Sequence, residues 1–243
     1  MIYGIFSDIH ANLEAMEVVY QSMKQKKVEE YFCLGDLVGY HANPNEVIDL
    51  IREMNCWKII LGNHDAACIE RISMNRFNEP AQKVLEWTRK QLTESNFQFL
   101  NQLILRCDVG DITLVHSSPF QSEEWHYLSQ LEDLEKNFRY FQGNICFFGH
   151  VHKPMIAEQA SNGEVKLINQ LEYTLKPHCR YLVNVGSVGQ ARDGNPQTAY
   201  VLYDSQSHQL LIQRLDYDFR KTAQKVRDVG LPEYFAQRLL LGK

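Results

Sequence analysis

The 243-residue sequence has few cysteines and no closely spaced cysteine pair. Its six cysteines are scattered, and three of them lie inside apolar runs, so neither a disulfide framework nor a thiolate zinc site is indicated. Positive charge is not in excess, because the formal net charge is −5. That balance argues against a nucleic acid polymer as the main partner, since phosphate backbones are bound by basic surfaces.

Long hydrophobic runs are also absent. No stretch approaches the roughly 18 consecutive apolar residues that cross a bilayer. The first ten residues, MIYGIFSDIH, lack the basic start of a signal peptide. We therefore expect a cytoplasmic protein without a membrane partner. No repeat, low-complexity tract or Pro/Gly/Ser-rich linker divides the chain, so one domain is expected.

Short apolar runs rich in β-branched and aromatic residues recur along the chain, and each is predicted to form a strand. They lie at residues 2–6, 31–34, 57–61, 112–115, 145–148, 181–185, 199–203 and 210–215, with a hairpin around Asn162-Gly163 in 155–168. Helical patterns occupy residues 12–23, a segment that begins with Asn43 and Pro44, 78–102 and 128–141. Strands that alternate with helices predict an α/β fold.

Five predicted strands are each followed at once by residues that bind metals or phosphate. These junctions are Ser7-Asp8-Ile9-His10, Gly35-Asp36, Gly62-Asn63-His64-Asp65, His116 and Gly149-His150-Val151-His152. Ligand sites in α/β sheets lie at the carboxyl ends of strands, so the junctions meet if the strands run parallel in one sheet. Each junction alone is compatible with an ordinary turn, but five of the nine histidines fall at these positions. The sequence therefore predicts one shared site.

The spacing of His150 and His152 adds a geometric expectation. Residues two apart in a strand point to the same side, so these imidazoles converge if the extended backbone continues past Gly149. A strand end with two solvated histidines is the alternative.

The predicted metal ligands are oxygen and imidazole donors without a thiolate: Asp8, His10, Asp36, Asn63, His116, His150 and His152. Seven donors exceed the needs of one tetrahedral ion and suit two ions that share a bridging carboxylate. Mixed nitrogen and oxygen donors favour two divalent or trivalent transition-metal ions over calcium or magnesium. Manganese or iron is expected first, and zinc, cobalt or nickel next. Two such ions acidify a bridging water and hold phosphoryl oxygens, which predicts hydrolysis of a phosphate ester.

Along the chain, the five junctions follow the order D-x-H, G-D, G-N-H-[DE], H and G-H-x-H. They resemble the signature of the calcineurin-like metallophosphoesterase superfamily. Residues 35–40, 77–88, 116–128, 184–194 and 230–242 are similar to its bacterial and archaeal diadenosine-tetraphosphatase-like branch. The resemblance implies a four-layer α/β/β/α sandwich of two mixed sheets with the metals at one edge. It also implies a single domain, residues 1–243, with a helical insert at about residues 66–110.

The resemblance further implies a role for each donor. One ion takes Asp8, His10, Asp36 and His152, and the other takes Asp36, Asn63, His116 and His150, so Asp36 is the bridge. His64 is then the catalytic residue, which assists the leaving oxygen while a metal-bridging hydroxide attacks. Asn63 and His64 would also contact the substrate, and Asp65 is expected outside the ligand set.

The second junction departs from the G-D-x-x-D-R-G pattern of phosphoprotein phosphatases, because residues 35–40 read GDLVGY. The missing Asp and Arg argue against protein phosphatase activity. Tyr40 is a candidate source of a hydroxyl, and Arg192 of a cation that binds phosphate. A solvated loop residue is the alternative for Arg192.

The expected function is hydrolysis of a phosphate ester or phosphoanhydride of a nucleotide, with dinucleoside polyphosphates and phosphodiesters as leading substrates. Aromatic residues in the helical segments are candidates for stacking a base, although at helical spacing such residues more often belong to the core: Trp87, Phe97, Phe99, Trp125 and Tyr127. A non-catalytic protein-binding scaffold of the same fold and a phosphoprotein phosphatase are the alternatives. The retained donors and His64 favour the enzyme.

Overall fold

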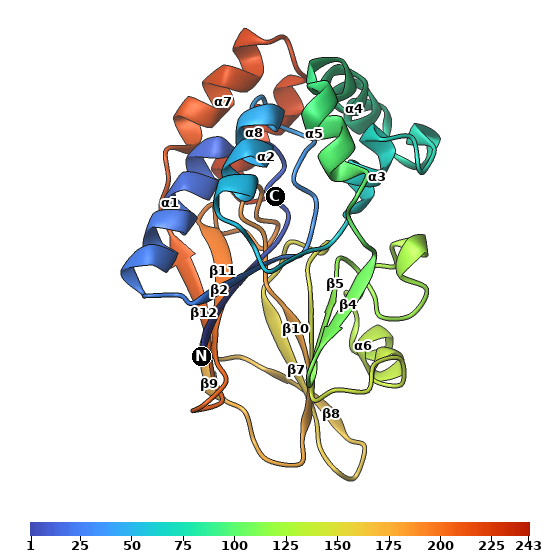
Figure 1. Cartoon of the computed structure of the whole chain (residues 1–243), viewed down its shortest axis with the longest axis vertical. Coiled ribbons are helices and arrows are strands. Elements are labelled where there is room, and N and C mark those ends of the chain that lie inside the picture. The colour runs from blue at the N-terminus through green and yellow to red at the C-terminus, as the bar shows by residue number, and fades with distance from the viewer.

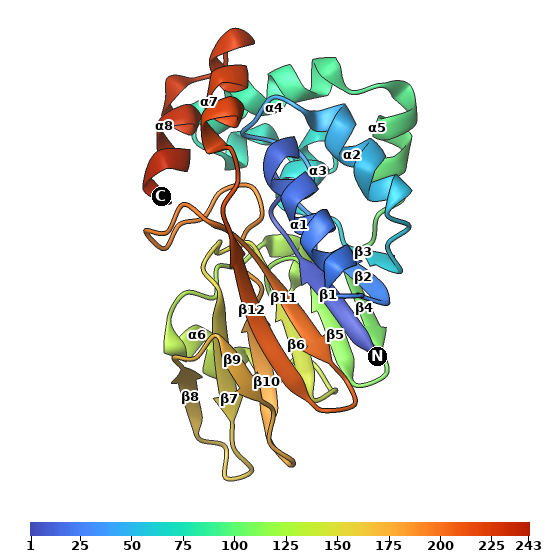
Figure 2. The same ribbon diagram turned by 90° about the vertical axis from the view of Figure 1, so that its left-hand side faces the viewer.

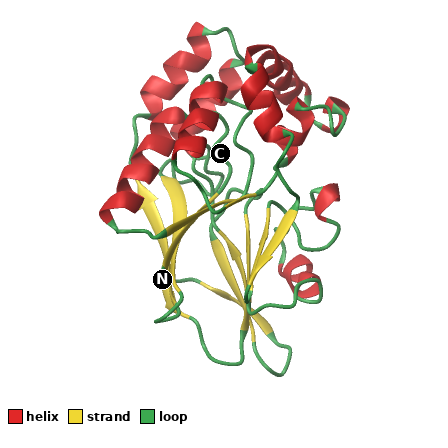
Figure 3. Cartoon of the chain, viewed as in Figure 1, coloured by secondary structure: helices red, strands yellow, loops and turns green.

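Two six-stranded mixed sheets pack face to face in the computed structural model, which describes residues 1–243 (Figures 1 and 3). In the order β3-β2-β1-β11-β12-β9, the first sheet contains Lys58–Ile59, Glu30–Cys33, Ile2–Phe6, Thr198–Asp204, Gln209–Leu215 and Glu172–Thr174. In the order β4-β5-β6-β10-β7-β8, the second contains Arg106–Val109, Ile112–Val115, Ile145–Phe148, Arg180–Asn184, Met155–Gln159 and Val165–Ile168. Strands β1, β2 and β3 are parallel, as are β5, β6 and β10.

The space between the sheets is filled by a cluster of 17 buried apolar side chains. Phe32 and Val201 of the first sheet belong to it together with Phe147 and Val183 of the second. All four residues of β5 and of β6 are buried, because these strands are covered on both faces. This explains why their sequences, ITLV and ICFF, are nearly continuous apolar runs rather than alternating patterns.

Helices cover the outer faces of both sheets and one end of the sandwich. Helix α1 (Leu13–Gln25) lies along the first sheet, and α6 (Leu131–Asn137) lies beside the second (Figures 1 and 2). The other helices gather at the end where the carboxyl ends of β1 and β2 lie: α2 (Pro44–Glu53), α3 (Asn63–Cys68), α4 (Glu79–Gln91), α5 (Glu94–Leu100), α7 (Phe219–Asp228) and α8 (Glu233–Leu241). The longest helices, α1 and α4, have 13 residues each, and no helix is a candidate membrane span.

The predicted architecture of two mixed sheets flanked by helices is confirmed, with local differences. The strand expected at 57–61 is only Lys58–Ile59, followed by a single bridge between Ile60 and Ile104. The helix expected at 78–102 is divided, because the Thr93 side chain caps a new helix by accepting a hydrogen bond from Asn96 N. The expected hairpin is present, since β7 and β8 pair antiparallel. The sequence interpretation missed α3, β4, β9, α7 and α8. The single domain with an insert at about 66–110 stays a prediction.

Candidate metal centre

The five polar junctions meet at one edge of the sandwich, but their strands do not share one sheet. Strands β1, β2 and β3 belong to the first sheet, whereas β5 and β6 belong to the second, so the junctions do not meet through one shared sheet. The junctions meet because the sheets face each other and both parallel sets end at the same edge. A hydrogen bond of 2.9 Å from His150 N to Asp8 Oδ2 joins the two sheets there.

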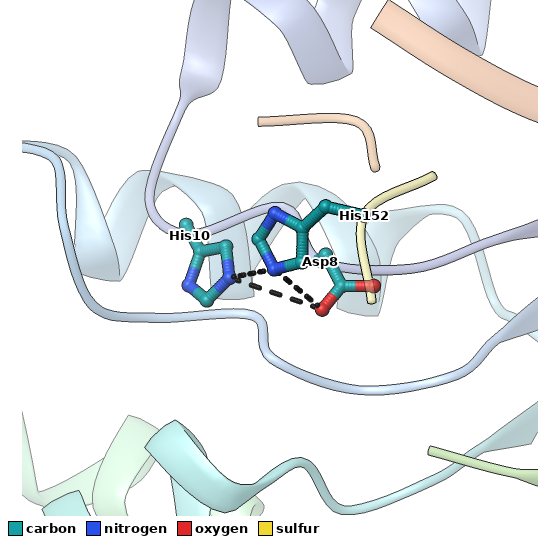
Figure 4. A group of neighbouring side chains, drawn as sticks. All are labelled: Asp8, His10 and His152. Atoms are coloured by element: carbon teal, nitrogen blue, oxygen red, sulfur yellow. Dashed lines mark hydrogen bonds and ion pairs between the residues drawn. The ribbon is translucent and has the colours of Figure 1, made fainter. Parts of the chain in front are cut away.

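The first group of donors consists of Asp8, His10 and His152, whose ligand atoms all lie within 4.8 Å of one another (Figure 4). The Nε2 atom of His152 lies 3.1 Å from Asp8 Oδ1 and 3.1 Å from His10 Nε2. Asp8 and His10 come from the loop after β1, and His152 comes from the loop after β6. All three side chains are buried.

The second group consists of Asp36, His116 and His150. Nε2 of His116 lies 3.4 Å from Asp36 Oδ2, 3.2 Å from His150 Nδ1 and 3.2 Å from Asn63 Oδ1. Asp36 Oδ2 also lies 3.6 Å from His10 Nε2, so this carboxylate stands between the two groups. The structure therefore brings all seven predicted donors together, and places Asp36 where a bridge would be needed.

The orientation of the rings indicates that the donors fit metal ions. In His10, His116 and His152, Nδ1 lies against a main-chain carbonyl, that of Val38, Leu34 and Gln190 respectively. Donation from Nδ1 leaves the Nε2 lone pair of each ring directed into the cluster, as in metal-binding histidines. Buried His150 Nε2 has no hydrogen-bond partner, and Asp8 Oδ1 faces imidazole Nε2 atoms, of which that of His152 lies 3.1 Å away. Unpartnered buried polar atoms are costly, and cations would satisfy them.

His150 and His152 reach the two groups by a turn instead of an extended backbone. Strand β6 ends at Phe148, and the two histidines have φ of 65° and 60°, in the left-handed region. The backbone therefore does not continue in an extended conformation past Gly149. His152 lies with Asp8 and His10, and His150 lies with Asp36 and His116.

The charges of the cluster are strongly coupled to one another. Burial alone would raise the pKa of Asp8, but the neighbouring His152 and His116 lower it to about 2. Burial opposes the protonation of His116, yet Asp36 and Asp8 raise its pKa to about 9. Burial also raises the pKa of Asp65 to about 7, although its carboxylate accepts hydrogen bonds from the main-chain N–H groups of Gly62 and Val38. These pKa shifts show a site whose carboxylates favour a compensating positive charge.

His64, Tyr40 and Arg192 form a connected group beside the donors. The Tyr40 hydroxyl lies 3.1 Å from His64 Nε2 and accepts a hydrogen bond of 3.0 Å from Arg192 Nη2. The main-chain N–H of His64 donates to Asp36 Oδ1, and burial lowers the pKa of the imidazole to about 4. Arg192 is half-buried in the loop before β11, and its buried Nε has no partner.

A cavity of about 250 Å³ opens beside this group. Asn63, His64 and His150 line it together with three aromatic residues and an ion pair: Phe77, Trp125, Tyr127 and Arg76 with Glu124. Trp125 and Tyr127 are thus at the cavity, although Trp125 is also a member of a core cluster. Trp87, Phe97 and Phe99 pack against apolar clusters, as the core alternative expected. A larger cavity, of about 480 Å³, lies at the other end of the sandwich and contains none of the predicted donors.

Sequence reasoning did not single out Phe77, Arg76 or Glu124. The ring of Phe77 lies 4.9 Å from that of His64, and Arg76 Nη2 lies 2.7 Å from Glu124 Oε2. These residues belong to helical and loop segments that reach the cavity through tertiary packing. No local sequence signal marks them.

Comparisons with known proteins agree with this geometry. A model of the "Calcineurin-like phosphoesterase superfamily domain" matches residues 1–208. An uncharacterized protein of Methanocaldococcus jannaschii is 35% identical over 244 residues, which cover 99% of this chain and 98% of that protein. The crystal structure of a metallophosphoesterase from Sphaerobacter thermophilus has 34% identity and a TM-score of 0.88 with full coverage of both chains. A candidate diadenosine tetraphosphatase has 13% identity and a TM-score of 0.53, covering 88% and 93%, which shows a shared fold alone.

Proposed function

The chain belongs to the calcineurin-like phosphoesterase superfamily and is a metal-dependent phosphoric ester hydrolase, and we propose that it acts on nucleotides. Dinucleoside polyphosphates and phosphodiesters are the leading substrates. The observation that carries the proposal is the pairing of two donor groups around Asp36 with an adjacent cavity that has an aromatic wall. Membership of the family implies a small phosphorylated substrate. The aromatic residues at the cavity support the proposal that this substrate is a nucleotide.

The proposed metal ligands follow the two donor groups. Asp8, His10 and His152 would hold one ion, and Asn63, His116 and His150 would hold the other, with Asp36 shared. The donor chemistry favours manganese or iron. When bound, the ions would acidify a water nucleophile and stabilise the charge that develops on the phosphoryl oxygens.

His64 is proposed to assist the leaving oxygen. Its imidazole is held between the Tyr40 hydroxyl and the Phe77 ring, and its main-chain N–H is fixed by Asp36. Tyr40 would orient His64, and Arg192 would bind phosphate oxygens through the N–H groups that Tyr40 leaves free. These two residues would thereby replace the missing Asp-Arg pair of phosphoprotein phosphatases.

The aromatic wall is proposed to contact the base. Trp125 is almost entirely buried and supports the wall, whereas Tyr127 is 54% exposed and packs against His150, with ring centroids 4.0 Å apart. Stacking of a base on an aromatic face contributes about 1–3 kcal/mol and tolerates different bases. A cytoplasmic location also stays a prediction.

A turnover panel tests the proposed function. The manganese-loaded protein would be assayed on phosphomonoesters, phosphodiesters, dinucleoside polyphosphates and phosphopeptides, with Asp36→Asn as the control for contaminating hydrolases. We expect turnover of nucleotides that the control variant lacks. Activity on phosphopeptides without activity on any nucleotide would reject the substrate proposal. A freshly purified protein that contains no metal would favour the non-catalytic scaffold.

A further inference from the structure

The C-terminal helix α8 places a second arginine next to Arg192. Phe235 of α8 stacks on Tyr40, with ring centroids 4.7 Å apart and an interplanar angle of 21°. At the other end of the helix, the carbonyl of Gly242 accepts a hydrogen bond of 2.9 Å from Gly194 N. The end of α8 therefore lies against the loop that carries Arg192 (Figure 2).

Arg238 lies on the helix face that makes both contacts. It follows Phe235 by three residues and precedes Gly242 by four, and positions three or four apart share one face of a helix. Phe235 contacts Tyr40, and Gly242 contacts the loop two residues beyond Arg192. Arg238 consequently belongs to the face of α8 that packs against Tyr40 and the loop carrying Arg192. The family model ends at residue 208, so it does not include this helix.

Neither guanidinium has a carboxylate side chain as a partner. Asp193, the nearest acidic residue in sequence to Arg192, is paired with Arg214 instead. Arg192 donates to the Tyr40 hydroxyl and leaves its Nε unpartnered. Arg238 Nε donates to the main-chain oxygen of Lys243, and its guanidinium lies 5.1 Å from the centroid of the Tyr234 ring. Partial burial and the nearby Arg192 lower the pKa of Arg238, as expected for two like charges without an anion between them.

We propose that Arg192 and Arg238 together form a second phosphate subsite, which holds the phosphate adjacent to the one at the metal centre. The proposal rests on the proposed function, and it narrows the substrate class to molecules with a phosphoanhydride chain. Two neighbouring arginines without a carboxylate side chain between them are stabilised by an anion with several oxygens, and guanidinium groups bind phosphate oxygens through two parallel N–H donors. A phosphomonoester offers no second phosphate to this subsite.

Binding to the manganese-loaded protein tests the subsite without relying on turnover. Calorimetric titrations with tripolyphosphate and with orthophosphate would compare the unmodified chain with Arg238→Gln. In Arg238→Gln, we expect the dissociation constant of tripolyphosphate to rise by about tenfold or more, because one charge-assisted contact is lost. The dissociation constant of orthophosphate should rise by less than about threefold. Arg238→Lys, which keeps the charge but not the paired donors, should lie between.

Arg220→Gln is the matched control. It removes the same charge from α7, the neighbouring helix, where Arg220 is exposed and forms no ion pair. Its titrations should equal those of the unmodified chain. Thermal unfolding of all variants checks that α8 remains folded. Repeating the titrations with ATP distinguishes a nucleotide from a free polyphosphate as the source of the phosphate chain. An equal loss of affinity for ATP and for tripolyphosphate means that the subsite binds only phosphates.

The outcomes separate the subsite from the proposed function. If Arg238→Gln lost equal affinity for tripolyphosphate and orthophosphate, or lost affinity for neither, the proposal of a second phosphate subsite would be rejected, whatever the chain hydrolyses. If Arg238→Gln lost affinity for tripolyphosphate alone and the unmodified chain hydrolysed no nucleotide, the subsite would stand and the proposed nucleotide hydrolysis would be rejected.

Discussion

His64 lies against the donor groups while its imidazole is held by Tyr40 and Phe77, so its removal should separate turnover from metal binding. In His64→Ala, we expect both metal ions to remain and kcat to fall by about 10²–10⁴-fold, the usual contribution of a group that transfers a proton. Metal analysis and steady-state kinetics on the same preparation measure the two quantities.

The control for this variant is His178→Ala, because His178 is exposed and lines the cavity at the other end of the sandwich. Its metal content and kcat should match those of the unmodified chain. Unchanged turnover in His64→Ala would remove His64 from the mechanism. Loss of one ion would instead make His64 a ligand, which is compatible with its position near His10 and Asp36.

Residues that carry their chemistry in a local motif were predictable from the sequence, and residues that act through packing were not. His150 and His152 were identified because a metal site needs donors at a strand end. Their left-handed φ values were not predictable, because the turn depends on the fit of Gly149 against Ser7 and Asp8 in another strand's loop. Arg238 was missed for a related reason, since it reaches the site only through the docking of α8.

At the scale of elements, the junction after β6 depends on the absence of a side chain at Gly149. A Cβ there would lie 2.1 Å from Ser7 Oγ and 2.4 Å from Asp8 Oδ2. We expect Gly149→Ala to push the β1 and β6 loops apart, lower the free energy of unfolding by about 2 kcal/mol and reduce the bound metal. Urea unfolding of the metal-free protein and metal analysis measure the two effects.

Gly163→Ala provides the comparison for this prediction. Gly163 lies in the β7–β8 hairpin with φ of 89°, and no atom lies within 4 Å of an added Cβ. The substitution should cost about 1 kcal/mol through the backbone alone and leave the metal content unchanged. If Gly149→Ala retained full metal content and the stability of the unmodified chain, the close contact across the two loops would not be needed.

The elements missed from the sequence are of two kinds. Helices α7 and α8 carry recognisable end signals, since the Asp218 side chain caps α7 and Gly242 ends α8 in the left-handed conformation, and these signals went unused. Strand β9 has only three residues, two of them exposed, and exists because it pairs with the edge of β12. Such an edge strand follows from the completed sheet and has no apolar pattern of its own.

At the scale of the whole molecule, the two-sheet arrangement followed from the family resemblance and not from the strand pattern. The runs at β1, β2, β5 and β6 predicted buried strands, but buried strands look alike in one sheet and in two. The division becomes visible only in the pairing, in which β1 joins β11 and β6 joins β10. Both partners lie more than 30 residues away along the chain, beyond the reach of local patterns.

Glu158 links the two sheets far from the metal centre, and it makes their association dependent on pH. Its side chain, which is 2% exposed on β7, accepts hydrogen bonds from Tyr181 of its own sheet and from Tyr173 of the other, at 2.9 and 2.6 Å. Lys176 Nζ lies 3.0 Å away. Burial alone would raise the pKa of this carboxyl, but the hydrogen bonds lower it from 4.5 to about 2. The charged form therefore stabilises the fold above pH 4.5, and this stabilisation is lost as pH falls toward 2.

In Glu158→Gln, the free energy of unfolding at pH 7 should be lower by about 2 kcal/mol, because the two tyrosines and the lysine lose a charged acceptor. The difference from the unmodified chain should shrink as pH falls from 4.5 toward 2, since protonation of Glu158 removes the same charge. Urea unfolding at pH 7, 5, 4 and 3 measures it, with Glu164→Gln in the exposed β7–β8 hairpin as the matched control without an effect. A difference that stays constant across this range would show that the substitution disturbs packing alone, and that the carboxylate charge of Glu158 does not hold the sheets together.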